Sequence, residues 1–164
     1  MAKKTNAVQP ISSGPVALDA TDRKLLSLLA EDSSRSYVEL GNLLNLSPPA
    51  VHERVKRLKR DRVIVATQAK LDGCKVGRTL LTFVLVTTNG VASTKRLLAL
   101  SSLPEVEEIH TVAGDSAVML KVRPRDTEGL EELLARIESI EGVEATRSYI
   151  ALSTFLERGP SPEL

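Results

Sequence analysis

The chain has 164 residues, of which 42% are apolar, so it can bury a core in one or two domains and is not predominantly disordered. Its 22 basic and 21 acidic side chains give a formal charge of +1, which alone indicates neither a nucleic-acid nor an acidic partner. The charge is uneven, because residues 1–70 hold 12 basic and 7 acidic side chains whereas residues 71–164 hold 10 and 14. This division predicts two domains with different partners.

Cysteine usage and hydropathy indicate the cellular compartment of the protein. The single cysteine, Cys74, excludes an intramolecular disulfide framework and a multi-cysteine zinc site, and it suits a reducing compartment. No apolar run of the sequence reaches the roughly 20 residues that span a bilayer. Residues 1–17 are polar, without a signal-peptide core, and are predicted to form a flexible arm. We therefore expect a cytoplasmic protein with no membrane partner.

Two short helices are predicted after the arm. Asp19 can cap the first helix, which bears a broad leucine face and ends near Asp32. Ser36 and Glu39 have the spacing of a capping box and predict the start of the second helix. Asn45 can adopt the left-handed conformation that ends this helix.

A third helix is predicted to start after Ser47 and to run to about Arg60. Ser47 is its N-cap, and the two prolines that follow occupy the first turn, where their missing N–H groups cost nothing. One face is apolar and comprises Val51, Val55 and Leu58. The opposite face is polar and comprises Pro49, His52, Glu53, Lys56 and Arg60, with Arg57 beside them.

Two short helices joined by a tight turn and supported by a preceding helix are typical of a helix-turn-helix domain, here predicted for residues 18–64. Residues 54–62 hold six basic side chains and one acidic, enough to neutralise several phosphates. A solvated charged face is the alternative interpretation, but the two caps and their spacing favour binding to double-stranded DNA. The predicted DNA-binding residues are Ser47, Pro49, His52, Glu53, Arg54, Lys56, Arg57 and Arg60.

A linker and a second domain follow. Val63–Leu71 alternates weakly in polarity and ends at Asp72-Gly73, so residues 65–78 are predicted to form a linker strand and a turn. Residues 79–155 contain strands and helices in the order β-α-β-β-α-β, and residues 156–164 form a tail. The predicted strands are Thr79–Thr87, Val106–Val112, Ala117–Val122 and Val143–Leu152. The predicted helices have Ser93 and Thr127 as caps and end near Leu103 and Ile140.

This order of elements predicts a ferredoxin-like domain, an antiparallel four-stranded sheet with both helices on one face. The strands are apolar in both registers, as in Leu80–Val86, so the other face would expose apolar side chains in a monomer. We therefore expect dimerisation through this domain, which would present two recognition helices to a pseudo-palindromic site. The predicted fold class is α+β, with a three-helix DNA-binding domain followed by a ferredoxin-like domain.

Several segments have the pattern of a known family, namely Leu18–Leu26, Glu39-Leu40, Leu46-Ser47-Pro48, Val51–Leu58, Val63-Ile64, Val112–Asp115, Gly142-Val143 and Thr146–Leu152. Together they resemble the Lrp/AsnC (leucine-responsive and asparagine-regulator, feast/famine) transcription factors of bacteria and archaea, over about residues 18–155. The resemblance implies a winged helix-turn-helix domain followed by an amino-acid-binding regulatory domain. It also implies homodimers, four of which often close into an octamer.

The resemblance further implies a small effector and a class of target genes. Effector amino acids of the family usually bind between dimers, beside the turn that here contains Gly114 and Asp115. The effector-binding residues expected on this basis are His110, Gly114, Asp115, Ser116 and Ala117. The protein would bind promoters of amino-acid metabolism genes, associate with the nucleoid and need no cofactor besides a possible amino-acid effector.

Two residues depart from the family pattern. Arg62 stands where a glycine usually ends the recognition helix, so it either accepts left-handed strain of about 1 kcal/mol or ends the helix differently. Ala117 stands where the effector turn usually has a second carboxylate, the natural partner of an α-ammonium group. This second departure predicts a more apolar effector or none that binds tightly.

Two alternatives to an effector-modulated regulator remain. An enzyme is disfavoured because the sequence has no phosphate loop and no His-Glu-x-x-His, and only His52 and His110 could act as imidazole bases. We therefore predict no enzymatic activity. An effector-independent, chromosome-organising DNA-binding protein is closer, and Ala117 favours it.

Overall fold

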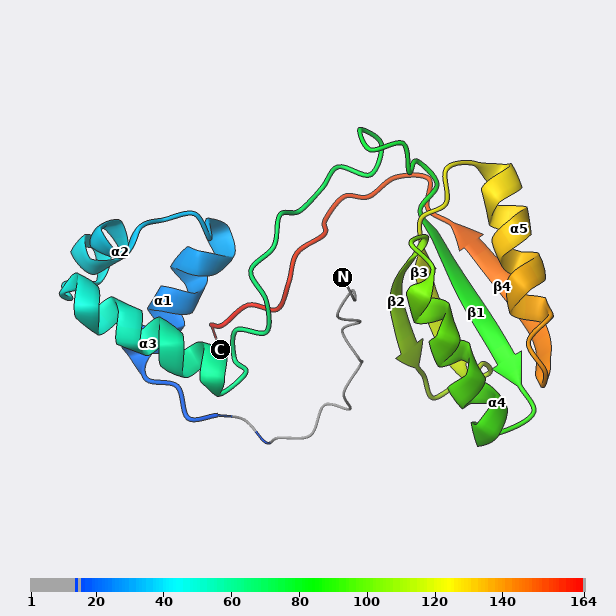
Figure 1. The fold of residues 1–164 in the computed structure, drawn as a ribbon, viewed down its shortest axis with the longest axis horizontal. Coiled ribbons are helices and arrows are strands. Elements are labelled where there is room, and N and C mark those ends of the chain that lie inside the picture. The colour runs from blue at the N-terminus through cyan, green and yellow to red at the C-terminus, as the bar shows by residue number, and fades with distance from the viewer. Residues whose placement is uncertain (1–13, 15, 164) are drawn as a thin grey trace, which may run out of the picture. The chain divides into compact units, whose positions relative to one another are not determined.

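The computed structural model describes residues 14 and 16–163 (Figure 1), so the predicted N-terminal arm lies almost wholly outside the described residues. The described chain forms two compact units, one made of residues 16–69 together with 156–163 and the other of residues 70–155. None of the described helices is long and apolar enough to cross a membrane.

The first unit contains three helices, α1 (Ala20–Glu31), α2 (Tyr37–Leu44) and α3 (Pro48–Arg60). All three predicted caps are confirmed, since Asp19, Ser36 and Ser47 each accept a hydrogen bond from a backbone N–H in the first turn. In α1 the cap is reciprocal, because Asp22 also accepts from the backbone N–H of Asp19. The core of this unit consists of Leu25, Leu40, Val51, Val55 and Leu58. Residues 156–163 join the unit where Arg23 Nη1 donates to the Pro162 carbonyl at 2.7 Å.

Two of these helices end at a residue in the left-handed backbone conformation. Asn45 ends α2 with φ of 54°, as predicted. After α3, Arg62 adopts φ of 56° and its N–H bonds the carbonyl of Lys59, while the N–H of Val63 bonds the carbonyl of Leu58. These two bonds form a Schellman motif, a helix ending that usually has glycine at the left-handed position. Arg62 therefore accepts the strain.

The predicted linker strand is wrong. Residues 61–81, all of them described, contain turns or bends at 61–64 and 73–77 and are otherwise irregular, without a paired strand. The helix-turn-helix unit therefore carries no strand-paired wing there. Val65 is 86% exposed and Leu71 is also exposed. A weak alternation of polar and apolar residues predicts a strand only where one face packs against a core. Val63 and Ile64 pack against the helical core, but residues 65–71 are all exposed.

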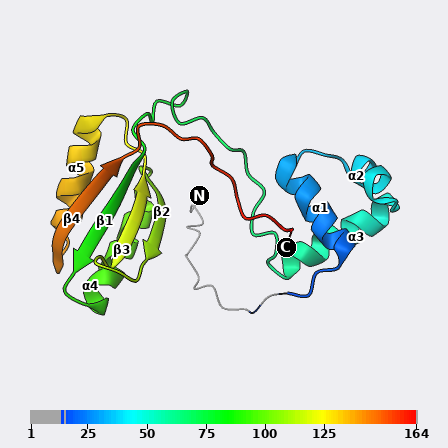
Figure 2. The same cartoon turned by 180° about the vertical axis from the view of Figure 1, so that it is seen from behind.

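The second unit is an antiparallel four-stranded sheet with spatial order β2-β3-β1-β4, as the ferredoxin-like prediction required. Its strands are β1 (Thr82–Thr88), β2 (Val106–Thr111), β3 (Val118–Val122) and β4 (Val143–Ile150). Its helices are α4 (Val91–Arg96), the 3₁₀ helix η1 (Leu97–Ser102) and α5 (Thr127–Glu138). The helices lie over one face (Figure 1), and the view from behind shows the strands uncovered by helices (Figure 2).

Two predicted helix starts are wrong. The helix expected from Ser93 to Leu103 is α4 followed by η1, and Gly90 stands at its N-cap position without a side-chain bond. Ser93 is instead buried inside the helix and donates to Asn89 Oδ1 at 2.6 Å. For α5 the cap is Asp126, which accepts from the N–H of Gly129 at 2.8 Å. For α5 a polar side chain one residue earlier was an equally plausible cap, whereas the N-cap position of α4 is a glycine that offers no side-chain cap.

The sheet has one buried and one open face. Alternate residues of β1 and β3, such as Val84 and Leu120, pack into the core against α5 and η1. The other register of the same strands places Phe83, Leu85 and Met119 on the face that no helix covers, where they are half-buried. The predicted apolar outer face is therefore present.

Candidate nucleic-acid interface

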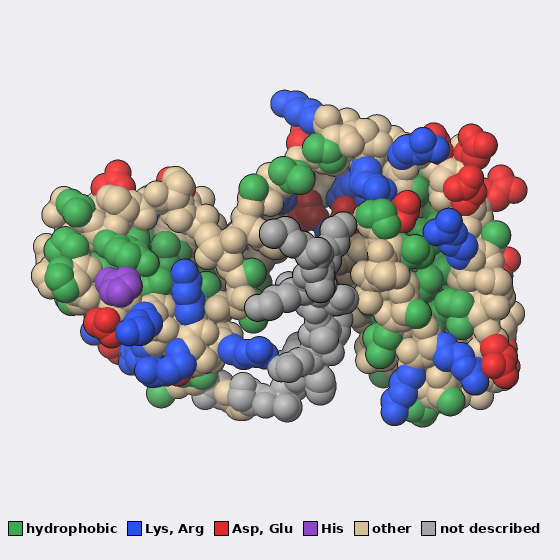
Figure 3. All heavy atoms as spheres, viewed as in Figure 1, with side chains coloured by type: hydrophobic (Ala, Val, Ile, Leu, Met, Phe, Trp, Pro, Cys, Tyr) green, Lys and Arg blue, Asp and Glu red, His purple; other side chains and the backbone are tan. Residues whose placement is uncertain are grey.

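The two faces of α3 differ as the sequence predicted. Val51, Val55 and Leu58 are buried against the other helices. The side chains of His52, Glu53, Lys56 and Arg60 are all more than half exposed. Ser47 and Pro49 lie exposed at the start of the helix. Figure 3 shows Lys and Arg side chains gathered over this helical unit. These exposed side chains are therefore free of the core packing that holds the opposite face.

His52 has an aromatic neighbour that was not predicted from the sequence. The rings of His52 and Tyr37 lie with centroids 5.4 Å apart and tilted by 48°. Tyr37 is the first residue of α2, so this contact joins the start of one helix to the exposed face of the next. Glu53 lies between an imidazole and an ammonium group, with its Oε1 3.7 Å from His52 Nδ1 and 3.9 Å from Lys56 Nζ.

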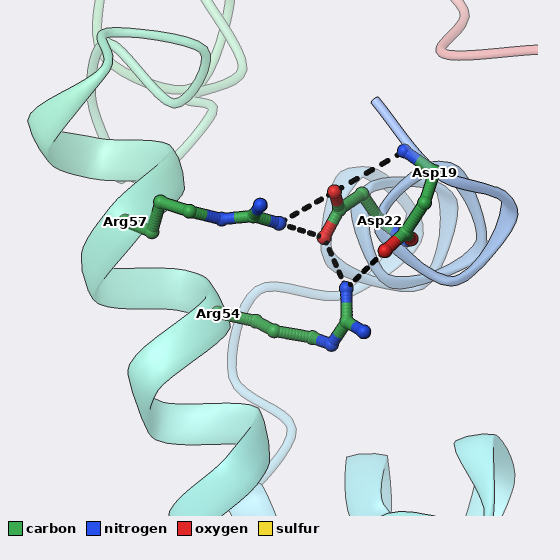
Figure 4. A network of polar contacts seen from close by, with 4 residues as sticks. All are labelled: Asp19, Asp22, Arg54 and Arg57. Atoms are coloured by element: carbon green, nitrogen blue, oxygen red, sulfur yellow. Dashed lines mark hydrogen bonds and ion pairs between the residues drawn. The ribbon is translucent and has the colours of Figure 1, made fainter. Parts of the chain in front are cut away.

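Two of the predicted DNA-binding arginines contact α1 (Figure 4). Arg57 Nη2 donates to Asp22 Oδ1 and Oδ2, both at 2.5 Å. Arg54 Nη1 is shared between Asp22 Oδ1 at 2.8 Å and Asp19 Oδ2 at 2.7 Å. Asp22 is buried, with a side chain only 1% exposed, whereas the Asp19 side chain is 51% exposed. We call these four residues the Asp-Arg network.

The contact between Asp19 and Arg54 stabilises the charged forms of these two residues. The hydrogen bond from Arg54 holds the pKa of Asp19 below its ordinary value, and the same bond raises the pKa of Arg54. Because the pKa of Asp19 is lowered on folding, its contribution to stability is present above the ordinary aspartate pKa. That contribution is lost as the pH falls through the lowered value.

An open groove runs along this network. Its volume is about 470 Å³, and it is lined by Asp19, Glu53, Arg54, Lys56, Arg57 and Arg60. Four cations thus surround two exposed carboxylates, one at the start of α1 and one on α3. Five of the predicted DNA-binding residues line this groove, namely Glu53, Arg54, Lys56, Arg57 and Arg60. The sixth lining residue, Asp19, was predicted from the sequence only as a helix cap.

The predicted effector residues lie around the β2–β3 turn. Gly114 and Asp115 are exposed, while Ser116 and Ala117 are half-buried. The turn is anchored because the N–H of Val112 bonds the carbonyl of Ala117 at 3.1 Å.

His110 lies on β2, where its partner is a glutamate of the same strand. Its Nε2 is 2.8 Å from Glu108 Oε2, and this hydrogen bond lowers the pKa of Glu108. Lys121 Nζ also donates to Glu108 at 3.2 Å. Within one chain, therefore, His110 belongs to an ion-pair cluster of the outer sheet face. Among the described residues no group of three or more His, Cys, Asp or Glu side chains could hold a metal ion.

A three-helix unit with an exposed basic last helix, joined to a ferredoxin-like unit, defines a two-domain helix-turn-helix regulator. Residues 18–59 match the model of the AsnC-type helix-turn-helix domain, and residues 81–161 match the model of the Lrp/AsnC ligand binding domain. The chain belongs to the Lrp/AsnC family of transcriptional regulators. The family and the fold class expected from the sequence are thus confirmed, and relatives are named as regulators rather than enzymes.

Named relatives match nearly the whole chain. The transcriptional regulator LrpA of Mycobacterium tuberculosis is 37% identical over 140 residues, covering 85% of this chain and 93% of its own. The structure of Escherichia coli AsnC superposes with a TM-score of 0.82 at 26% identity, covering 90% of this chain and all of that one. A feast or famine regulatory protein of M. tuberculosis in complex with L-methionine has a TM-score of 0.78 at 36% identity, covering 86% and 96%.

Proposed function

We propose that this transcriptional regulator binds double-stranded DNA at promoters of amino-acid metabolism genes through α3, and that an amino acid bound by the second unit modulates it. The observation that carries the DNA-binding part is the exposed polar face of α3, with Lys56 and Arg60 beside His52. Such a face, backed by a buried apolar seam, fits the major groove.

We assign different roles to the two ends of this face. Residues at the start of a recognition helix approach base edges, so Pro49, His52 and Glu53 would read sequence. Lys56 and Arg60 lie further along and would contact phosphates, which position the protein but carry no sequence information. The Tyr37 ring would hold the imidazole of His52 in place, since their centroids are 5.4 Å apart.

Substituting Lys56 by alanine is expected to weaken binding to every duplex alike and to reduce the slope of log K against log salt by about 0.9. Substituting His52 by alanine is expected to change the ranking of DNA sequences selected from a random pool. Fluorescence anisotropy over a salt series measures the first effect, and sequencing of selected duplexes measures the second. Equal losses on selected and random DNA for His52→Ala would contradict the role of His52.

We assign the effector to the β2–β3 turn. An amino acid presents a carboxylate, which backbone N–H groups can bind, and an ammonium, which needs an anionic partner. Asp115 is the carboxylate that residues 112–118 supply. Because Ala117 adds no second charge, the turn favours a ligand with an apolar side chain. The methionine complex of the M. tuberculosis relative supports this class of ligand.

Calorimetry on the full chain tests the effector. We expect methionine to bind the wild type more tightly than asparagine does, and Ala117→Asp to shift the preference towards polar amino acids. Tight binding of asparagine to the wild type would contradict this assignment. No heat from any amino acid, with DNA binding retained, would favour the effector-independent, chromosome-organising function instead.

We also propose that the helix-free sheet face joins two copies, and that dimers assemble further, with an octamer as the expected end. The half-buried Phe83, Leu85 and Met119 on that face support the dimer, because a partner would remove them from water. Sedimentation of the samples used for calorimetry reports the size of the assembly with and without ligand.

A further inference from the structure

We propose that the groove between the start of α1 and α3 is a DNA-phosphate site, in which Asp19 is a built-in counter-ion that a phosphate displaces from Arg54. The proposal rests on the DNA-binding function above and adds a site on α1 to it. Four cations line this groove, and the carboxylate of Asp19 stands among them.

The two carboxylates of the Asp-Arg network differ in how easily they can be exchanged. Asp22 is buried and accepts hydrogen bonds from both Arg54 and Arg57, so its removal would leave two guanidinium groups without their shared partner. Asp19 is half exposed, and of the two arginines it contacts Arg54 alone, at 2.7 Å. Exposed ion pairs contribute little net stability. Asp19 is therefore the member that an incoming anion can replace.

Arg54 is already oriented for that exchange. Its Nη1 is shared between Asp19 and Asp22, so when Asp19 withdraws, the buried Asp22 still holds the guanidinium in place. A guanidinium fixed before binding loses little conformational freedom when it meets a phosphate, and charge-assisted bonds of this type are strong. Lys56 and Arg60 line the same groove and add positive charge around the position that the phosphate would take.

A carboxylate that competes with phosphate for Arg54 affects binding to every DNA sequence. Phosphate contacts supply essentially all of the affinity for non-specific sequences, so a carboxylate that occupies one of the contacts lowers non-specific binding most directly. A promoter site whose base contacts hold a phosphate over the groove loses less. Asp19 would thus improve discrimination between sites by weakening the unwanted complexes.

Asp19→Ser in the full chain tests the proposal, because serine caps a helix as well as aspartate does and removes only the carboxylate. We expect a random-sequence duplex to bind about two- to fivefold more tightly near 0.1 M salt. The slope of log K against log salt should steepen by about 0.9, the value for one more neutralised phosphate. Fluorescence anisotropy measures both, and circular dichroism shows that the variant is folded.

Two matched variants isolate the cause. Asp32→Asn makes the same change of charge at the other end of α1, where the Asp32 carboxylate bonds Ser34, and should leave the affinity nearly unchanged. Asp19→Ser in an Arg54→Gln background should give no gain, because the guanidinium that the phosphate would reach is absent.

Each other outcome overturns the proposal. A purely structural role of Asp19 predicts weaker or unchanged DNA binding in Asp19→Ser, the opposite sign from that expected here. An equal gain in Asp32→Asn, or in the Arg54→Gln background, would assign the effect to overall charge. If the wild type itself binds no duplex, the DNA-binding function falls and this site with it, whereas normal wild-type binding with an unaffected Asp19→Ser removes this site alone.

Discussion

Replacing Asp22 by asparagine is expected to lower the free energy of unfolding of the three-helix unit by about 2–4 kcal/mol. The carboxylate is buried and accepts hydrogen bonds from Arg54 and Arg57. The amide would remove the anion that the two guanidinium groups share, so that Arg57 loses its carboxylate partner and Arg54 keeps only the half-exposed Asp19. Both arginines are partly exposed and can reach water, which keeps the loss below that of a fully buried pair. Urea unfolding followed by circular dichroism measures it.

Asp19→Ser provides the matched control for this prediction. It removes a carboxylate of the same network that is half exposed, and it keeps the cap of α1, so it should cost less than about 1 kcal/mol. Similar losses for the two variants would show that the depth of burial does not decide the energetics of this network.

Replacing Gly142 by alanine is expected to destabilise the ferredoxin-like unit by about 2–4 kcal/mol. Gly142 has φ of 86°, in the region that side chains rarely adopt. A Cβ there would also overlap the side chains of Ser93 and Asn89, which are hydrogen-bonded to each other. The N–H of Asn89 bonds the Gly142 carbonyl at 2.9 Å, so the backbone cannot simply move away. Thermal unfolding of the variant should show the loss.

Gly114→Ala is the control in the same unit. Nothing lies within 4 Å of the Cβ that would be added at Gly114, and its φ lies outside the range that disfavours side chains. Its thermal midpoint should stay within a degree or two of the wild type, as is usual for surface substitutions that change stability by less than about 0.5 kcal/mol. A midpoint for Gly142→Ala equal to that of Gly114→Ala would contradict the steric argument.

Local signals predicted most of the helices correctly because caps and turns depend on a few neighbouring residues. Asp19, Ser36 and Ser47 act within three positions of their partners, and the structure confirms each. The prediction of a strand over residues 63–71 was wrong, because a strand must pair with a distant segment and the sequence does not reveal such a partner. The prediction that Ser93 caps a helix was wrong for a related reason. Its hydroxyl donates to Asn89 inside the fold instead of accepting a bond at the start of the helix.

The candidate site likewise has features that local sequence predicts and features that depend on distant contacts. The wheel of α3 correctly separated buried Val51 from exposed Lys56, because helical period alone decides that. It could not show that Arg57 turns back to Asp22, a partner 35 positions away in the chain. The contact between Tyr37 and His52 was missed likewise, since it depends on how two helices pack.

Residues 156–163 return to the helical unit, where the Pro162 carbonyl accepts a hydrogen bond from Arg23. This unit is therefore not one continuous segment of the sequence. A fragment ending at residue 69 would expose the α1 surface that the end of the chain meets. Stability and DNA binding of the helical unit are therefore better measured on a protein that retains residues 156–163.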